Sequence, residues 1–152
     1  MAVQRLKKEY KDFSLNGSPE FTAGPVREED MYDWQAVMKG PDGTPYENGI
    51  FFLNLKYPMD YPFKPPKISF TTRVYHPNIK SNGELGYIKL YKDGWSPSFT
   101  IQKVLQEIFE MMKNPRFDTD DRMPLTEPAK QYKYDRSGFN AKAKAWTEEH
   151  AM

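Results

Sequence analysis

The most informative absence in this 152-residue sequence is cysteine, which occurs nowhere in it. Without a thiol the chain has no disulfide, no thiolate ligand for a metal and no cysteine nucleophile. Histidine is nearly as scarce, because His76 and His150 are the only two, and two histidines alone do not make a histidine-rich metal centre. We therefore expect no metal and no other cofactor.

The sequence also lacks an excess of charge and long apolar runs. Lys plus Arg number 22 and Asp plus Glu number 21, a net charge of +1, which argues against the dense basic face of a nucleic-acid-binding protein. No run of about 18 apolar residues is present to span a membrane. Charged residues such as Arg5 and Asp12 interrupt the N-terminal stretch, unlike a secretory signal. We expect a cytoplasmic or nuclear protein that acts without a membrane.

Proline and glycine gather in the middle of the chain. Ten of the 13 prolines lie from Pro19 to Pro97, and eight of the nine glycines lie from Gly17 to Gly94. Because both residues interrupt regular elements, we expect helices near the chain ends and short strands with turns between them. With no repeat, low-complexity tract or linker, residues 1–152 are predicted to form a single domain.

Apolar spacing of three and four residues predicts the helices. It places a helix at 2–15, a stronger one at 99–112 that Ser98 or Thr100 could cap, and a last one at 135–149. Pro128 fits the first turn of a further short helix. Alternating or aromatic-rich runs predict strands at 32–38, 50–57 and 67–70. The order helix, strand meander, then helices indicates an α+β domain with an antiparallel sheet.

Four motifs then follow in a fixed order. They are the proline–aromatic segment 57–66, the Tyr-His-Pro-Asn-Ile motif at 75–79, Ser-Asn-Gly at 81–83 and Trp-Ser-Pro at 95–97. Together they resemble the core of the ubiquitin-conjugating enzymes, over essentially the whole chain. The resemblance implies the ubiquitin-conjugating (UBC) fold, with an N-terminal helix, a four-stranded antiparallel meander and C-terminal helices.

Members of this family carry ubiquitin as a thioester on a cysteine shortly after the Asn-Gly pair, and this chain has none. Ile88-Lys89-Leu90 resembles the signature around that cysteine and puts Lys89 in its place. An ungapped count from the His-Pro-Asn motif puts Gly86 there instead. The stretch from Gly83 to Trp95 is one residue longer than the family pattern and lacks its usual Leu-Asp pair, so both positions stay open, with Lys89 preferred.

A lysine at that position would end a transfer relay, because an amine that attacks a thioester forms a stable amide. The alternative, which we favour, is that Lys89 is a solvated surface lysine. Near it, His76 is expected to brace the loop, while Asn78 could either hold the loop or donate to a developing oxyanion. The chain is therefore either a natural non-catalytic family member or an enzyme whose cysteine has been substituted, and whether it is an enzyme stays open.

The resemblance also implies partners: ubiquitin or a ubiquitin-like protein, RING-type or HECT-type ubiquitin ligase domains, and an active conjugating enzyme. The ligase-binding residues would be Arg5 on the first helix, Phe63, and the loop of Ser96, Pro97 and Ser98. An exposed aromatic ring with an arginine is a common composition of binding hot spots. The alternative is that the Phe63 ring packs inward against its neighbouring prolines.

An acidic stretch follows the long helix and contains Asp118, Asp120 and Asp121. In active relatives an acidic residue of this region orients or deprotonates the incoming lysine. The stretch is longer here than in the family, so no single aspartate can be matched to that role. The alternative is that these residues solvate a loop and cap the next helix.

Overall fold

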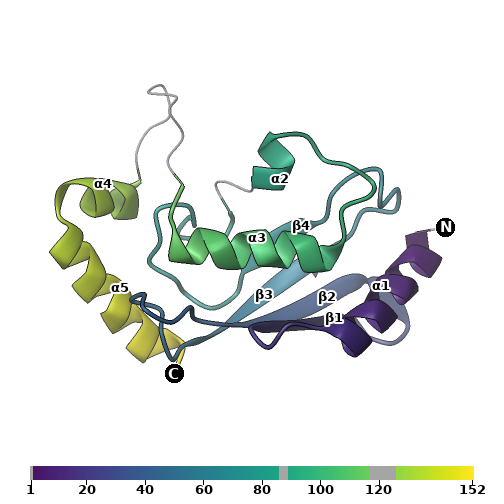
Figure 1. Cartoon of the computed structure of the whole chain (residues 1–152), viewed down its shortest axis with the longest axis horizontal. Helices are drawn as coiled ribbons and strands as arrows, with labels where there is room; N and C mark the ends of the chain where they lie inside the picture. The colour runs from purple at the N-terminus through teal and green to yellow at the C-terminus, as the bar shows by residue number, and fades with distance from the viewer. Residues whose placement is uncertain (1, 86–88, 117–125) are drawn as a thin grey trace.

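A computed structural model describes residues 2–85, 89–116 and 126–152 of the chain. The elements follow in the order α1 (Ala2–Asn16), β1 (Phe21–Arg27), β2 (Asp30–Lys39), β3 (Ile50–Lys56), β4 (Lys67–Phe70), α2 (Lys89–Lys92), α3 (Ile101–Lys113), α4 (Glu127–Tyr134) and α5 (Arg136–His150). An N-terminal helix, a meander of strands and C-terminal helices make an α+β architecture, as predicted (Figure 1).

The four strands form one antiparallel sheet in the order β1-β2-β3-β4, so that each strand pairs with the next in the chain. The register places Trp34 opposite Leu55, and Leu55 opposite Ile68. Period-two alternation sends one side of each strand inward, which is why Trp34, Leu55 and Ile68 are all buried. The three strands predicted from hydrophobic pattern are thereby confirmed as β2, β3 and β4.

The core lies between the sheet and α3, which crosses one face of it (Figure 1). The apolar residues whose spacing predicts the long helix are all buried: Ile101, Val104, Leu105, Ile108, Met111 and Met112. Phe21 on β1 and Phe109 on α3 meet with ring centroids 6.4 Å apart. Phe21 also lies 5.9 Å from Phe13 of α1, so one chain of aromatic contacts joins α1, the sheet and α3.

Side-chain caps fix where the helices begin. Thr100 accepts the Lys103 backbone N–H at the start of α3, which confirms one of the two predicted caps. At the start of α4 the Thr126 side chain accepts the Ala129 backbone N–H, and Pro128 lies in the first turn as predicted. Asp135 caps α5 through the Gly138 N–H at 3.1 Å. In Figure 1 α4 and α5 lie at the end of the molecule opposite to α1.

Two elements had no signal in the hydrophobic pattern. Strand β1 contains Pro25, which lacks an N–H and is tolerated because β1 is an edge strand. Helix α2 has only four residues, too few for a helical period to show.

Candidate functional site

His76 is fully buried in the loop that follows β4. Its Nδ1 accepts the Asn78 backbone N–H at 3.0 Å, so the proton of the neutral ring is on Nε2, which lies 2.9 Å from the Met111 carbonyl oxygen. Burial lowers the pKa of His76 to about 4, against the opposing effect of its bond to Met111. The imidazole is therefore neutral at pH 7 and ties this loop to α3.

The Asn78 side chain joins the same loop to the segment after α3. Its Oδ1 accepts the Arg116 backbone N–H at 2.8 Å, and its Nδ2 donates to the Arg116 carbonyl. These two bonds use the carboxamide oxygen and one amide hydrogen, so the second hydrogen is the one left to stabilise an oxyanion. These contacts show Asn78 holding the loop, the first of the two roles considered for it. Donation to a developing oxyanion stays a prediction.

The two candidate positions for the missing cysteine follow a tight turn. Gly83 has φ +90°, and a Cβ there would lie 2.0 Å from the Phe70 carbonyl oxygen, so only glycine fits. The chain then forms a bridge between Leu85 and Ile79. Gly86 lies outside the described residues, whereas Lys89 is the first residue of α2 and only its backbone is described. The choice between them stays a prediction.

The two residues that follow Lys89 attach α2 to the rest of the fold. Leu90 is buried. Tyr91 donates its hydroxyl to the Pro66 carbonyl, and burial raises the pKa of that hydroxyl. The Tyr91 contact was missed because nothing in the sequence pairs residue 91 with residue 66.

The predicted acidic residues Asp118, Asp120 and Asp121 lie outside the described residues. The residues that flank them both contact the His-Pro-Asn motif. Arg116 is held by Asn78, and the Thr126 hydroxyl lies 3.4 Å from the Pro77 carbonyl oxygen. The last described residue before the acidic stretch and the first one after it are therefore both attached beside His76.

Arg5, the first predicted ligase contact, is bonded within its own chain. Its Nη2 donates to the Pro97 carbonyl at 2.9 Å and to the Phe99 carbonyl at 3.1 Å. Its Nε donates to Glu9 at 3.1 Å. The guanidinium thus holds the 95–99 loop against α1, a positioning role that the sequence did not indicate.

Phe63 instead faces solvent. Its residue is 66% exposed, and Met59, four residues earlier, is 83% exposed. At this exposure the ring does not pack inward against the proline segment (residues 57–66), which local turns fold, such as the bond from the Phe63 N–H to the Asp60 carbonyl at 2.9 Å. The proline segment thus carries two exposed apolar side chains, four residues apart in the sequence.

The second loop completes this surface. Trp95 donates its indole N–H to the Pro62 carbonyl at 2.7 Å, which joins the 95–99 loop to the proline segment. Pro97 and Ser98 are exposed, and Ser96 and Ser98 share a hydrogen bond of 2.9 Å. We call the group Met59, Phe63, Ser96, Pro97 and Ser98 the Phe63 surface; Arg5 lies beneath it as a support.

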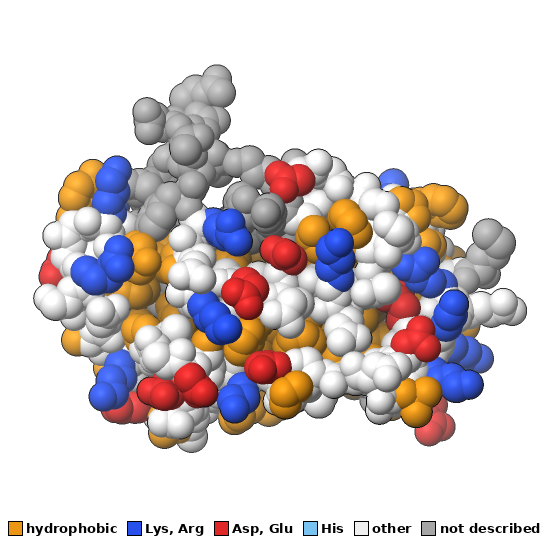
Figure 2. Space-filling model, viewed as in Figure 1, with side chains coloured by type: hydrophobic (Ala, Val, Ile, Leu, Met, Phe, Trp, Pro, Cys, Tyr) orange, Lys and Arg blue, Asp and Glu red, His pale blue; other side chains and the backbone are white. Residues whose placement is uncertain are grey.

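Outside the regions described above, the charged and metal-binding side chains give few other candidates for a functional site. In the face drawn in Figure 2, acidic and basic side chains are interspersed among the described residues. Within residues 2–85, 89–116 and 126–152, no group of three or more His, Asp or Glu side chains is placed to hold a metal ion. No helix in that part of the chain is both long and apolar enough to cross a bilayer.

Comparison with known protein families agrees with the sequence resemblance. A family model described as ubiquitin-conjugating enzyme matches residues 5–147, nearly the whole chain. With the helix–meander–helices order observed, this confirms the fold prediction. The matched region includes the His-Pro-Asn motif and the Phe63 surface but no cysteine.

Proposed function

Since this chain belongs to the ubiquitin-conjugating enzyme family, we propose that it acts in the ubiquitin pathway as a binding protein that carries no thioester. In this proposal it is a cytoplasmic or nuclear protein, a scaffold or variant subunit that binds ubiquitin ligase domains, ubiquitin or an active conjugating enzyme. The observation that carries it is an ordered, exposed Phe63 surface in a chain without any thiol.

The chemistry of the vacant position supports a non-catalytic role. Transfer through the family requires a thiolate that accepts ubiquitin and then releases it to an amine or another thiol. Neither candidate residue can do this: Gly86 has no side chain, and Lys89 would form an amide with no easy onward transfer. Attack by a lysine amine also requires its neutral form, of which an ordinary lysine has very little at pH 7.

Loading with ubiquitin tests the non-catalytic role directly. The chain, its Lys89→Cys variant and its Gly86→Cys variant would each be incubated with ubiquitin-activating enzyme, ATP and ubiquitin, then separated with and without reducing agent. Our proposal expects no thiol-sensitive conjugate from any of the three. A thiol-sensitive band from either variant would contradict it and would identify the position of the lost cysteine.

One observation favours a second candidate, an active conjugating enzyme whose cysteine has been substituted. The His-Pro-Asn loop is intact, with His76 bonded to α3 and Asn78 bonded to Arg116. An intact loop is expected of an enzyme that has lost only its cysteine. This candidate expects the Lys89→Cys variant to form the thiol-sensitive conjugate.

Binding tests the other half of the proposal. Isothermal titration of the chain with RING and HECT domains that bind active family members should show an interaction that Phe63→Ala weakens about tenfold or more. Tyr134→Ala is the matched control, since Tyr134 is a 74% exposed aromatic residue on α4, at the end of the molecule opposite to α1 (Figure 1). Equal effects of the two substitutions would show that Phe63 is not the contact.

A further inference from the structure

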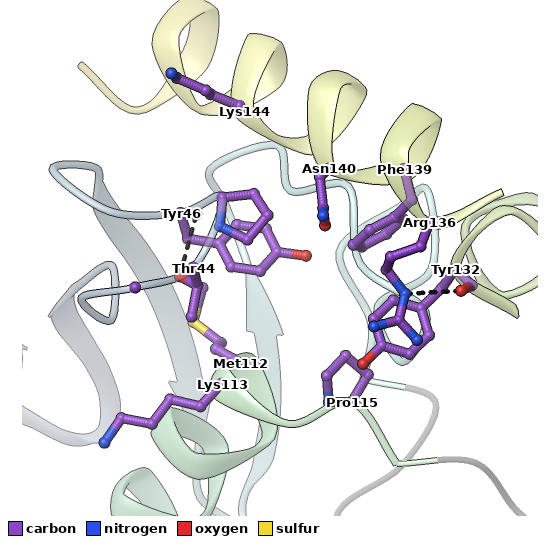
Figure 3. Close-up of a pocket in the computed structure, with 12 residues that line it drawn as sticks. Thr44, Tyr46, Met112, Lys113, Pro115, Tyr132, Arg136, Phe139, Asn140 and Lys144 are labelled. Carbon is purple, nitrogen blue, oxygen red and sulfur yellow. Dashed lines mark hydrogen bonds between the residues drawn. The ribbon is translucent and has the colours of Figure 1, made fainter.

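A cavity of about 390 Å³ lies away from the Phe63 surface, between the β2–β3 connection, the end of α3 and the α4–α5 pair. Its volume falls within the usual range of small-molecule sites, roughly 300–1,000 Å³. Half-buried rings of Pro45, Pro115 and Tyr132 form part of its wall, and Figure 3 shows Pro115 and Tyr132 on one side of it. The cavity therefore offers apolar contact to a small planar group.

The charge of the cavity wall is of one sign. Three of the twelve lining residues are basic, Lys113, Arg136 and Lys144, and none is acidic. Lys113 is paired with Glu110 at 3.7 Å, and in Figure 3 the ammonium groups of Lys113 and Lys144 point outward from the rim. Arg136 is thus the cation best placed to meet a ligand inside the cavity.

The Arg136 guanidinium is held in one orientation. Its Nε donates to the Tyr132 carbonyl at 2.9 Å, and its Cζ lies 3.4 Å from the centre of the Tyr132 ring. No partner for its two terminal nitrogens is found among the described residues, and these nitrogens form the planar fork that matches phosphate or carboxylate. Fixing the fork in advance reduces the entropy that binding would cost.

Asn140 supplies a second polar group, one turn further along α5. Figure 3 shows its amide pointing into the space between Tyr46 and Phe139. Within the described parts of the chain the amide has no hydrogen-bond partner, so its N–H groups are available to an anion. The neighbouring carboxylate of Asp135 is directed instead to the Gly138 backbone N–H, at the start of α5.

We propose that this cavity binds a small organic anion, a planar apolar body that carries a phosphate or carboxylate group. The anionic group contacts the terminal nitrogens of Arg136 and the amide of Asn140. The apolar body lies against Pro45, Pro115 and Tyr132. This site depends neither on the missing cysteine nor on ligase binding. The proposal can therefore be tested separately from the function proposed above.

The test uses the full chain, labelled with ¹⁵N, and 1-naphthyl phosphate as the probe. Amide shifts followed through a titration should change around Thr44, Lys113, Arg136 and Asn140 and should saturate. Arg136→Gln and Asn140→Asp should each weaken binding about tenfold or more, because one removes the cation and the other adds a carboxylate. Lys130→Gln is the matched control: this exposed α4 lysine does not line the cavity, and the affinity should be unchanged.

Two further ligands separate the parts of the proposal. Inorganic phosphate and neutral 1-naphthol should each bind more weakly than 1-naphthyl phosphate. Equal binding by either one would overturn the assignment of an organic anion. Shifts located elsewhere, or equal affinities of the Arg136→Gln and Lys130→Gln variants, would overturn the site itself. The amide spectrum of each variant shows whether it is folded, and Asn140→Asp changes an exposed side chain only.

Discussion

The Glu9 carboxylate on α1 accepts the backbone N–H of Ile101, the first residue of α3, at 2.7 Å. Its other oxygen accepts the Tyr61 hydroxyl and the Arg5 Nε–H. Burial and the nearby Glu9 charge both raise the pKa of Tyr61, which keeps its hydroxyl protonated as a donor. One buried carboxylate thus joins α1, the proline segment and the start of α3.

Glu9→Ala should destabilise the fold by about 3 kcal/mol, because it leaves the partners of a buried charge unsatisfied. Glu9→Gln keeps an acceptor for Ile101 but loses the charge, and it should fall between the alanine variant and the parent. Urea unfolding measures the three free energies. Glu148→Ala, at an exposed position on α5, is the control. If Glu9→Ala lowered the free energy of unfolding no more than Glu148→Ala does, this account would be contradicted.

Tyr57 and Tyr46 allow a comparison of how much a buried tyrosine hydroxyl contributes to stability with and without a hydrogen-bond partner. The Tyr57 hydroxyl is buried and has no hydrogen-bond partner among the described residues, whereas Tyr46 donates to the Tyr75 carbonyl at 2.6 Å. Tyr57→Phe should be neutral or stabilising by up to about 1 kcal/mol, since it removes an unpaired polar group. Tyr46→Phe should destabilise by about 1–2 kcal/mol. Thermal and urea unfolding measure the stability of both variants. A larger loss of stability for Tyr57→Phe than for Tyr46→Phe would contradict the prediction.

The buried neutral state of His76 makes the fold sensitive to acid. Its pKa is about 4 in the fold against an ordinary 6.5, so between these values the unfolded chain binds more protons. Stability should therefore fall as pH is lowered from 6.5 to 4, by about 3 kcal/mol in total from this residue. His76→Gln should flatten this part of the pH profile. An NMR titration in which the His76 ring charges near pH 6.5 would contradict the prediction.

Substitutions of Asn78 test whether its bonds to Arg116, in the segment after α3, hold the His-Pro-Asn loop in place. Asn78→Ala removes both bonds to Arg116 and should cost about 1–2 kcal/mol. Asn78→Asp keeps an acceptor for the Arg116 N–H but sets a carboxylate against its carbonyl. Hydrogen exchange of the Arg116 amide should therefore be fastest in the alanine variant. Unchanged exchange there would show that another contact protects this amide.

The sequence predicts the fold well where burial follows a simple period. The inward faces of β2 and α3 are examples, because Trp34 on β2 and Leu105 on α3 stand at regular spacing. On α1 the period misleads at two neighbouring positions. Tyr10, whose spacing falls on the apolar stripe of the helix predicted at 2–15, is 42% exposed, while the charged Glu9 is 6% exposed. Burial of Glu9 depends on partners from distant segments, which no local pattern contains.

The candidate site is predictable to the extent that motifs mark it. The His-Pro-Asn motif and the exposed Phe63 follow from the family resemblance, but the support given by Arg5 and Glu9 does not. The spacing of Arg5 and Glu9 matches an ordinary surface ion pair on a helix. Only the fold brings this pair against the Pro97 carbonyl and the Ile101 N–H. The cavity beside Arg136 likewise had no sequence signal, because its walls come from four separate elements.

The nearest-neighbour order of the sheet has a consequence for how the chain folds. Every strand pair joins consecutive strands, which close short loops and form quickly, whereas Glu9 and Ile101 are 92 positions apart. We expect the meander to be formed in the transition state and the α1–α3 contact to form after it. Substitution of Glu9 should then accelerate unfolding and leave the refolding rate almost unchanged. The lifetime of the native state would be set where α1 meets α3, rather than in the sheet.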